Sequence, residues 1–509
     1  MDLSGRRGNG LTFVLILVLV LVIDGFANAN VVFNMKHKFG GKKVDNFATK
    51  LAGKSFLGSL KEHDVQRHGR MLAAIDFQLG GNGLPTDTAL YYTKLSIGTP
   101  AKDYYVQMDT GSDNLWINCA GCEGCPTKSN LGIKLTRYDL SASSTGKTIS
   151  CHEDFCSSAI YNSHGPDSAC LVGSQCGYAI TYGDGSKTAG DYVKDNFRFD
   201  KISGDLQTSP MEGILAFGCS SKQFGDLGSS TLAVDGIVGF GQANSSILSQ
   251  LAASGKSRKI FSHCLDSVEG GGIFAIGEVV EPKVKTTPMV PDMPHYNAFL
   301  EKIEVGSSSI FVADKLTDDG TFGGGKGGKT STTAIIDSGT TLAYLPIEVY
   351  DSLMSKLMSH QPGLKTHTVE QDFQCISYSK DVDDGFPVVS FHFENSAILK
   401  AYPHDYLFKY DELYCFGWQN KAVQTSSGEE VTLLGDLVLS DKLIVYDVEK
   451  QTIGWTEYNC SSSIKVKDEQ TGKVHSVVAH HISSSTCILQ NGISIPFFLL
   501  ILVLWNLLV

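Results

Sequence analysis

The sequence predicts a mostly β protein, and three observations support this. Glycine makes up 53 of the 509 residues without a collagen-like period; this exceeds the average share of about 7 % and favours turn-rich β structure over a helical bundle. Short apolar segments separated by turn residues follow one another from about Leu90 to Cys460, as is typical of strands. Signals for helices are sparse over the same range.

Three segments are clear strand candidates. Tyr92–Ile97 alternates between apolar and polar side chains, which predicts a half-buried strand. Tyr105–Met108 runs directly into Asp109, and Thr333–Ile336 runs directly into Asp337. Two predicted strands therefore end at an aspartate.

One helix is predicted just after Pro346. Its apolar residues have helical spacing, and we interpret them as a face turned toward the core. These residues are Val349, Leu353, Met354, Leu357 and Met358.

An internal repeat links the two aspartates. The first strand ends in the turn Asp109–Ser112, and the second ends in the turn Asp337–Thr340. An apolar-apolar-Gly segment follows each turn later in the chain, at Gly236–Gly241 and at Leu433–Asp436. A single Asp-Thr-Gly or Asp-Ser-Gly is common in ordinary turns, but the same order occurring twice is far more specific.

The repeated turn suggests a reaction. A glycine two residues after the aspartate lets the backbone fold tightly, and hydroxyl neighbours can hydrogen-bond the carboxylates. If an approximate two-fold axis brings the turns face to face, the carboxylates share one proton, because both cannot ionise at contact distance. The ionised member then takes a proton from an attacking water, and the protonated member donates to the substrate carbonyl. We expect neither a metal nor a cofactor.

With these motifs the sequence resembles the pepsin-like aspartic endopeptidases. The resemblance rests on Asp109–Trp116 and Ala334–Thr341, and it covers roughly Tyr91 to Cys460. It implies a mostly β, bilobal fold with a pseudo-two-fold axis and a cleft between the lobes. The implied function is hydrolysis of an extended peptide or protein substrate.

The same resemblance implies roles for particular residues. Asp109 and Asp337 fall on the catalytic positions, and Ser112 and Thr340 fall on the supporting hydroxyls. The segment Tyr182–Ser186 resembles the flap that closes over substrate, although it also fits a plain hairpin turn. The flap and substrate-binding candidates are Tyr182, Gly183 and Trp116, of which Trp116 also fits a simple core position.

Whether the cysteines bind a metal or form disulfides depends on the compartment in which the protein folds. Cys119, Cys122 and Cys125 have metal-site spacing, which in a cytosolic protein would suggest zinc or an iron–sulfur cluster. In an oxidising compartment disulfides are expected instead. Twelve of the 13 cysteines form an even set that could pair completely. Cys487 is left over, and it lies beyond Ser483–Ser485, which are proposed below as sites of lipid attachment.

The family resemblance adds two expectations about cysteines. The cysteine-rich segment from Cys119 to Cys176 is similar to the insertion of the plant nepenthesin- and nucellin-like subgroup. Cys375 and Cys415 are expected to bridge within the second lobe. The other pairings stay open.

The N-terminus predicts export. Arg6 and Arg7 precede the apolar run Leu11–Ile23, and Ala27–Ala29 supplies a small-x-small cleavage pattern. We therefore expect a signal peptide at 1–29, with a signal anchor as the alternative.

The C-terminus predicts attachment to a membrane. Residues 493–509 carry no charge and follow small residues, as in a GPI-attachment signal. The attachment candidates are Ser483, Ser484 and Ser485. The expected location is the extracellular face of the plasma membrane, and a single transmembrane helix is the alternative.

A basic segment precedes the body of the chain. Residues 31–72 hold nine Lys and Arg but only three acids, in a chain whose net charge is -12. We interpret 30–75 as a propeptide of a zymogen whose cations cover an acidic cleft, with a solvated basic arm as the alternative. The expected mature start lies between about Arg70 and Asp87. The remaining divisions are an N-terminal lobe at 76–285, a C-terminal lobe at 286–462, a polar stalk at 463–484 and the removed signal at 485–509.

Several other features have simpler explanations. The acidic balance without a long basic block argues against nucleic acid as a partner. Gly323–Thr330 matches the Walker A pattern, but without the strand and helix that a phosphate loop needs we expect a flexible loop. His475, His480 and His481 could bind a metal, but a solvated stalk explains them better.

Two sequons and one alternative function complete the predictions. Asn244 and Asn459 lie in glycosylation sequons, which fit a secreted surface. We expect a monomer that acts as an aspartic endopeptidase. The alternative is a catalytically inactive protein of the same fold that acts as a surface binding or inhibitor protein; the intact turns and Tyr182 favour the enzyme.

Overall fold

The computed structural model describes residues 72–482, apart from 88, 162–174, 230, 314–329, 371, 422, 425–427, 429 and 470. The chain divides into two units, Met1–Arg67 and His68–Val509. Every described residue belongs to the second unit. The predicted signal peptide, almost all of the propeptide, the attachment serines and most of the glycine-rich loop lie outside the described residues.

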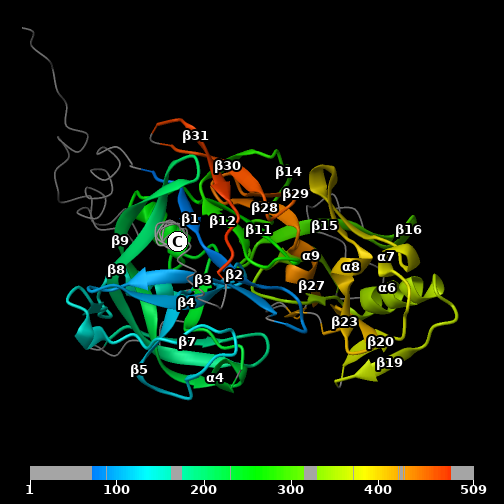
Figure 1. The fold of residues 1–509 in the computed structure, drawn as a ribbon, viewed down its shortest axis with the longest axis horizontal. Helices are drawn as coiled ribbons and strands as arrows, with labels where there is room; N and C mark the ends of the chain where they lie inside the picture. The colour runs from blue at the N-terminus through cyan, green and yellow to red at the C-terminus, as the bar shows by residue number, and fades with distance from the viewer. Residues whose placement is uncertain are drawn as a thin grey trace, which may run out of the picture. The chain divides into compact units, whose positions relative to one another are not determined.

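The largest sheet has fifteen strands, and its main path runs in the order β14-β29-β28-β11-β12-β1-β8-β9-β5-β10-β4-β3-β2, with β6 and β7 paired to β8 (Figure 1). Its strands are β1 (Ile75–Phe77), β2 (Leu79–Asn82), β3 (Leu90–Ile97), β4 (Lys102–Asp109), β5 (Trp116–Glu123), β6 (Lys147–Thr148), β7 (Gly177–Thr181), β8 (Lys187–Gly204), β9 (Gln207–Phe224), β10 (Gly236–Gly239), β11 (Ile260–Leu265), β12 (Gly272–Ile276), β14 (Lys285–Pro288), β28 (Lys442–Asp447) and β29 (Thr452–Glu457).

A nine-stranded sheet lies in the C-terminal half, with the path β22-β21-β15-β17-β27-β18-β25. Its strands are β15 (Asn297–Val305), β16 (Ser308–Val312), β17 (Thr330–Ile336), β18 (Ala343–Tyr344), β21 (Val389–Phe393), β22 (Ala397–Ala401), β25 (Trp418–Gln419), β26 (Val423–Gln424) and β27 (Glu430–Leu434). A four-stranded sheet contains β19 (Thr366–Val369), β20 (Phe373–Ile376), β23 (Leu407–Tyr410) and β24 (Leu413–Phe416), and a three-stranded sheet contains β13 (Glu278–Glu281), β30 (Ser463–Lys467) and β31 (Val474–Val478).

Helices are short in the described part of the chain. They are α3 (Asp154–Tyr161), α4 (Asp226–Ser229), α5 (Ile247–Ala253), α6 (Ile347–Ser359), α7 (Val382–Gly385), α8 (Pro403–Tyr406) and α9 (Asp436–Leu439), with 3-10 turns at Leu140–Ala142 and Glu394–Ser396. Among the described residues no helix has the length and apolar character needed to cross a bilayer.

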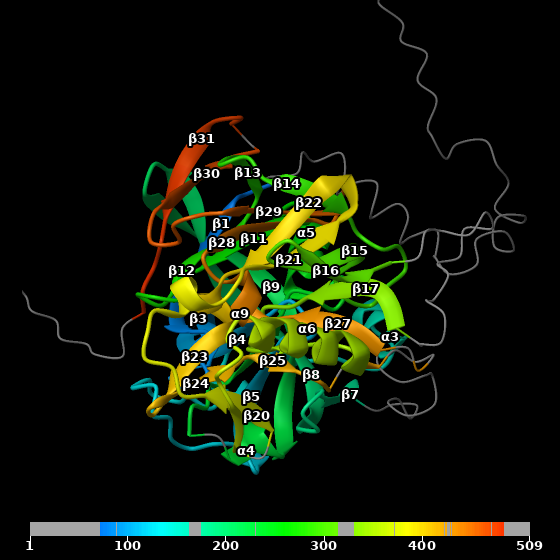
Figure 2. The ribbon, with the colours of Figure 1, turned by 90° about the vertical axis from the view of Figure 1, so that its right-hand side faces the viewer.

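The predicted helix is confirmed as α6. Pro346 precedes its first turn, and Val349, Leu353 and Leu357 are buried as the helical spacing requires. This face packs against β15 and β16 of the nine-stranded sheet (Figure 2).

The strands that carry the repeated turns are also confirmed, and they are paired alike in the two halves. β4 ends at Asp109 and lies parallel to β10, with Gly239 opposite Asp109. β17 ends at Ile336 and lies parallel to β27, with Leu434 opposite Ile336. The internal repeat of the sequence is therefore a repeat of structure.

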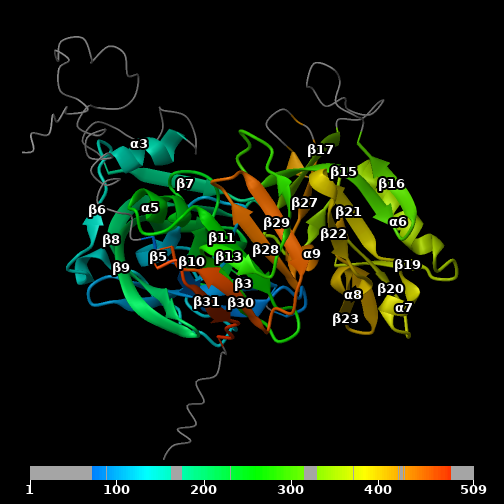
Figure 3. The ribbon, with the colours of Figure 1, turned by 90° about the horizontal axis from the view of Figure 1, so that it is seen from above.

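The two halves share strands toward one end of the large sheet. β28 and β29 come from the C-terminal part of the chain, yet β28 pairs with β11 of the N-terminal part (Figure 3). Aromatic rings pack at this junction, and the rings of Phe261 and Tyr446 stack with their centroids 4.5 Å apart. The predicted mostly β, bilobal fold is confirmed.

The cysteines with metal-site spacing form disulfide bonds, as expected for an oxidising compartment. Cys119 pairs with Cys219, and Cys122 pairs with Cys125. The other bonds whose two partners are described are Cys156–Cys176, Cys264–Cys460 and Cys375–Cys415. Cys151 is also disulfide-bonded. The Cys375–Cys415 bond is the one that the family resemblance implied.

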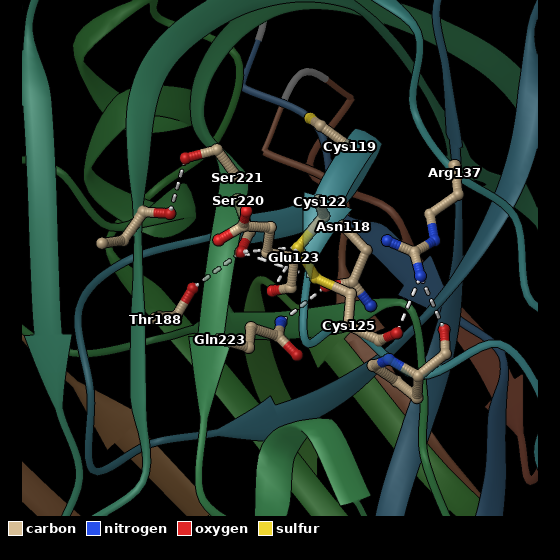
Figure 4. The surroundings of a disulfide bond; sticks show 12 residues. Asn118, Cys119, Cys122, Glu123, Cys125, Arg137, Thr188, Ser220, Ser221 and Gln223 are labelled. Atoms are coloured by element: carbon tan, nitrogen blue, oxygen red, sulfur yellow. Dashed lines mark hydrogen bonds between the residues drawn. A yellow bond between two sulfur atoms is a disulfide. The ribbon is translucent and has the colours of Figure 1, made fainter.

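The Cys122–Cys125 loop joins a network of polar side chains (Figure 4). The Ser220 hydroxyl lies 3.8 Å from the sulfur of Cys122 and 4.0 Å from that of Cys125. Thr188 Oγ1 donates to Ser220 Oγ at 3.0 Å. The insertion is thus tied to β8 and β9, which continue from the flap hairpin.

The predicted polar stalk is wrong over its described part. Residues 463–482 contain the hairpin β30–β31, which pairs with β13. Ile464, Val466 and Val477 are buried in a cluster with the Cys264–Cys460 region. The alternation of apolar and polar residues in these short strands supplies one buried face, which the emphasis on serine-rich composition overlooked.

Candidate active site

The two repeated turns meet tip to tip. A Cβ atom placed on Gly111 would lie 2.5 Å from the Asp337 carboxylate, and one on Gly339 would lie 2.0 Å from Asp109 Oδ1. Side chains do not tolerate such distances, so each turn requires glycine where the opposite carboxylate approaches. Asp109 and Asp337 are each only 7 % exposed.

Each carboxylate has the same set of partners. The Gly111 N–H donates to Asp109 Oδ1 at 2.8 Å, and the Ser112 hydroxyl donates to Asp109 Oδ2. In the second turn the Gly339 N–H donates to Asp337 Oδ1 at 2.8 Å, and the Thr340 hydroxyl donates to Oδ2 at 2.7 Å. The sequence predicted both hydroxyl partners.

The central residues of the turns join the two halves. The Ser338 N–H donates to Thr110 Oγ1 at 2.8 Å, and Thr110 Oγ1 donates to the Ile336 carbonyl at 3.5 Å. Ser338 Oγ is buried without a hydrogen-bond partner among the described residues. The backbone of the second turn is thus fixed to a side chain of the first.

The apolar-apolar-Gly segments support the turns from behind. The Phe240 N–H donates to the Asp109 carbonyl at 2.8 Å, and the Asp337 N–H donates to the Leu434 carbonyl at 3.0 Å. A Cβ on Gly239 would lie 2.4 Å from the Asp113 carbonyl carbon, and one on Gly435 would lie 2.2 Å from the Thr340 carbonyl oxygen. Only glycine allows this backbone contact.

Burial and mutual repulsion make the pair hold a proton. Burial, and next the Asp337 carboxylate, raise the pKa of Asp109 to about 7, against the lowering effect of its hydrogen bonds to Ser112 and Gly111. Burial also raises the pKa of Asp436 well above its usual range, and the charges of Asp337 and Asp109 add to this. Burial and the two neighbouring carboxylates therefore favour the protonated form of Asp436.

The tyrosine of the predicted flap lies near the first turn. Tyr182 stands in the turn between β7 and β8, where the Gly185 N–H donates to its carbonyl at 3.0 Å. Trp116 Nε1 donates to the Tyr182 hydroxyl at 2.7 Å, so the expected brace is present. Burial and the nearby charge of Asp109 raise the pKa of Tyr182, which keeps its phenol neutral. Gly183 is exposed, and its Cβ position faces open space.

The structure therefore brings together Asp109, Asp337, Ser112, Thr340 and Tyr182 with Trp116. The two sequon asparagines, Asn244 and Asn459, lie apart from this group on exposed positions. Ser246, which completes the first sequon, is buried and caps α5 by accepting from the Ser249 N–H.

Sequence reasoning assigned no role to three residues near the turns. Asp436 directly follows the second apolar-apolar-Gly segment, but nothing in the sequence indicated that its carboxyl is buried. Asp113 accepts a hydrogen bond from the Ala243 N–H at 2.8 Å. His295 contacts the first turn from the connection between the halves, and nothing in its sequence neighbourhood indicated this.

The paired turns on a two-lobed β fold define the class of pepsin-like acid proteases. The family model described as "Xylanase inhibitor N-terminal" matches residues 91–278, and the one described as "Xylanase inhibitor C-terminal" matches residues 295–457. Aspartic proteinase 39 of Arabidopsis thaliana is 48 % identical over 478 residues, which cover 94 % of each chain. Aspartic proteinase 36 of the same plant is 47 % identical over 489 residues, covering 96 % of this chain and 95 % of the relative. The chain belongs to the family of plant pepsin-like aspartic proteases.

Solved structures share the fold. Basic 7S globulin from soybean has a TM-score of 0.58 at 19 % identity, covering 76 % of this chain and 96 % of the globulin. Conglutin gamma, a basic 7S globulin from lupine seeds, has a TM-score of 0.56 at 17 % identity, covering 77 % of this chain and 96 % of the conglutin. At these identities the likeness concerns architecture alone.

Proposed function

We propose that this protein is an aspartic endopeptidase in which Asp109 and Asp337 activate a water molecule. One observation carries the proposal: the two carboxylates lie across from each other with matching hydroxyl and backbone donors. The catalytic assignment is supported by the raised pKa of Asp109, since a shared proton is what acid–base catalysis by such a pair requires.

The pair would carry out both proton transfers of peptide hydrolysis. Its ionised member removes a proton from water as the oxygen attacks the peptide carbonyl, and its protonated member donates a proton to the carbonyl oxygen. When the tetrahedral intermediate collapses, the C–N bond breaks and the leaving amine receives a proton from the pair. The products are a carboxylic acid and an amine, and the pair again holds one proton.

The substrate would be an extended peptide or an unfolded protein segment held in the expected cleft beneath Tyr182. The neutral phenol of Tyr182 and its bond to Trp116 support the flap assignment. The disulfide-rich region between Cys119 and Cys219 supports placement in the nepenthesin- and nucellin-like subgroup. We expect the enzyme to work as a monomer.

The test is proteolysis by the processed protein. A soluble form ending near Ser484 is incubated with a denatured protein from acidic to neutral pH, with and without pepstatin, beside an Asp109→Asn variant. We expect cleavage at acidic pH that pepstatin blocks and that Asp109→Asn lowers by at least about a thousandfold, because the asparagine cannot share the proton.

Two controls make the result decisive. Mass measurement confirms that the basic segment has been removed, and thermal unfolding confirms that the variant is folded. If the processed, folded protein leaves the substrate intact at every pH, the endopeptidase proposal is wrong and a binding or inhibitor role of the same fold takes its place.

We further propose that the protein is secreted, glycosylated at exposed asparagines and held at the plasma membrane by a GPI anchor. The disulfides support passage through an oxidising compartment, and the exposure of Asn244 and Asn459 is compatible with glycosylation. Phosphatidylinositol-specific phospholipase C should release the protein from intact cells. Protein that stays on the membrane after this treatment but is fully lost after deletion of 493–509 would indicate a transmembrane helix instead.

The basic segment 30–75 is proposed to act as a propeptide over the acidic pair. Its cations would lose their partners as the carboxylates protonate at low pH. N-terminal sequencing of the secreted protein should then begin between about Arg70 and Asp87, whereas a start at Val31 would contradict this proposal.

A further inference from the structure

A histidine from the connection between the halves contacts the first catalytic turn. His295 lies between β14 and β15, and its Nδ1 is 2.9 Å from the carbonyl oxygen of Gly111. A carbonyl oxygen only accepts hydrogen bonds, so Nδ1 carries the hydrogen and donates it. The side chain is half-buried.

The peptide group that His295 contacts also serves Asp109. The carbonyl of Gly111 and the N–H of Ser112 belong to one peptide group, and this N–H is a hydrogen-bond donor to Asp109 that lowers the pKa of the carboxyl. A donor at the carbonyl end polarises the peptide and strengthens the N–H as a donor at its other end. His295 thus acts on Asp109 through one peptide group without touching it.

The histidine is itself held in place from the β10 side. Gln242 Nε2 donates to the His295 carbonyl at 2.8 Å and to the Met293 carbonyl at 3.3 Å. The hydroxyl of the next residue, Tyr296, donates to the Phe240 carbonyl at 2.6 Å in a fully buried position. The segment after the first apolar-apolar-Gly motif therefore fixes the histidine backbone.

Charged groups surround both ends of this contact. Asp113, in the segment that follows the turn, is close enough to His295 for the histidine to lower the pKa of the Asp113 carboxyl, which burial otherwise raises. Asp109 itself is faced by Asp337 from the second turn, by Asp436 from α9 and by Tyr182 from the flap. A substitution at His295 therefore leaves the other titratable groups around Asp109 unchanged.

We propose that His295 is a positioning residue for proteolysis, which holds the Gly111–Ser112 peptide so that its N–H points at the Asp109 carboxylate. The proposal rests on the proposed endopeptidase function. It gives a residue of the connection between the halves a role in the chemical step. This residue lies outside the repeated motifs.

The experiment compares processed wild-type protein with His295→Leu, which removes the donor, and with His295→Asn, whose amide nitrogen can take the place of Nδ1. His360→Leu is the matched control, because His360 Nδ1 also contacts a backbone carbonyl, that of Lys356 at 3.0 Å, on the exposed end of α6. Each variant is assayed for kcat and KM on one peptide from pH 3 to 8, and its thermal unfolding is recorded.

For His295→Leu we expect kcat to fall about three- to tenfold with KM within about twofold, as for loss of one hydrogen bond that acts in the chemical step. The alkaline limb of the kcat/KM profile, which the pKa of Asp109 sets, should move to higher pH, because a weaker N–H donor stabilises the ionised carboxylate less. His295→Asn should restore kcat to within about twofold of wild type, and His360→Leu should leave both constants unchanged.

The proposal is overturned if His295→Leu keeps wild-type kcat, if it changes KM alone, or if His295→Asn is as slow as His295→Leu. Should His295→Leu fail to fold, His295→Gln replaces it, since its longer side chain carries an amide that misses the Gly111 carbonyl. If the processed wild-type protein shows no pepstatin-sensitive cleavage, the endopeptidase function itself is refuted.

Discussion

At the scale of single residues, Asp436 is a buried carboxyl whose pKa is raised next to the two aspartates of the active site. It is 1 % exposed, and its Oδ1 has no hydrogen-bond partner among the described residues. Burial and the neighbouring Asp337 and Asp109 raise its pKa well above the usual range. Between its unfolded pKa of about 4 and this raised folded pKa, the carboxyl is protonated in the folded protein and ionised in the unfolded chain. Unfolding then releases a proton.

This proton release predicts a pH-dependent gain of stability in Asp436→Asn. A group whose pKa is raised on folding stabilises fully below its unfolded pKa, and this stability is lost as the pH rises toward the folded pKa. Relative to wild type, the variant should therefore gain up to about 1.4 kcal/mol for each pH unit above about 4. Thermal unfolding at pH 4, 5, 6 and 7 measures the trend.

The exposed Asp384 provides the control, since Asp384→Asn alters a carboxyl that faces solvent. A difference in Tm between Asp436→Asn and wild type that stays constant from pH 4 to pH 7 would contradict a raised pKa at Asp436.

At the scale of elements, the flap is a hairpin whose position depends on a neighbouring strand. Residues 177–181 of β7 pair with residues 187–191 of β8, and Trp116 at the start of β5 donates to the Tyr182 hydroxyl through its indole nitrogen. Asp184 stabilises the hairpin tip by accepting from the Ser186 N–H and hydroxyl, each at 2.8 Å. The hairpin tip is thus hydrogen-bonded internally, and the bond from Trp116 ties its tyrosine to β5.

A double-mutant cycle tests this contact. Trp116→Phe and Tyr182→Phe each remove the same hydrogen bond, so each should lower kcat/KM by about three- to tenfold. The kcat/KM of the double variant should be no lower than that of the less active single variant, because the same hydrogen bond is lost only once. If the two losses instead multiply, the residues act independently and the brace is not responsible for the position of the flap.

At the scale of the whole described body, the two halves are joined by shared strands and by one long-range disulfide. Cys264 on β11 bonds to Cys460 just after β29, across a separation of 196 residues. The Cys122–Cys125 bond closes a separation of only 3 residues. A cross-link that closes a longer loop removes more conformational entropy from the unfolded chain.

The loop lengths predict unequal losses of stability. Replacing Cys264 and Cys460 by alanine should cost about 5 kcal/mol, and replacing Cys122 and Cys125 should cost about 2 kcal/mol, on the chain-entropy scale. Urea unfolding of the two double variants measures the difference. Equal losses would show that the long-range bond does not act by restricting the unfolded chain.

The sequence was informative wherever a pattern repeats or has a period. The two Asp turns, the apolar-apolar-Gly segments that follow them and the helix α6 could all be predicted from a repeat or a period in the sequence. The parallel pairing of those segments with β4 and β17 came only with the structure. The supporting roles of Ser112 and Thr340 followed from the family resemblance, and the structure shows both hydroxyls bonded to the carboxylates.

Features that depend on distant packing could not be predicted in this way. The pairing of β28 with β11 and the contact of His295 with Gly111 join segments 183 or 184 residues apart. The hairpin β30–β31 was mistaken for a stalk because its strands are short and lie between serine-rich segments, although tertiary packing buries one face.

The most direct test of the account is the pH dependence of kcat/KM for the processed protein on one peptide substrate. A shared proton requires activity to fall as the pH rises through about 7, where the raised pKa of Asp109 places the loss of that proton. We predict that kcat/KM decreases near this pH with the slope expected for loss of one proton, and that the Asp109→Asn variant is inactive. Activity that stays constant from pH 5 to pH 9, or that persists in Asp109→Asn, would contradict catalysis by a proton-sharing pair.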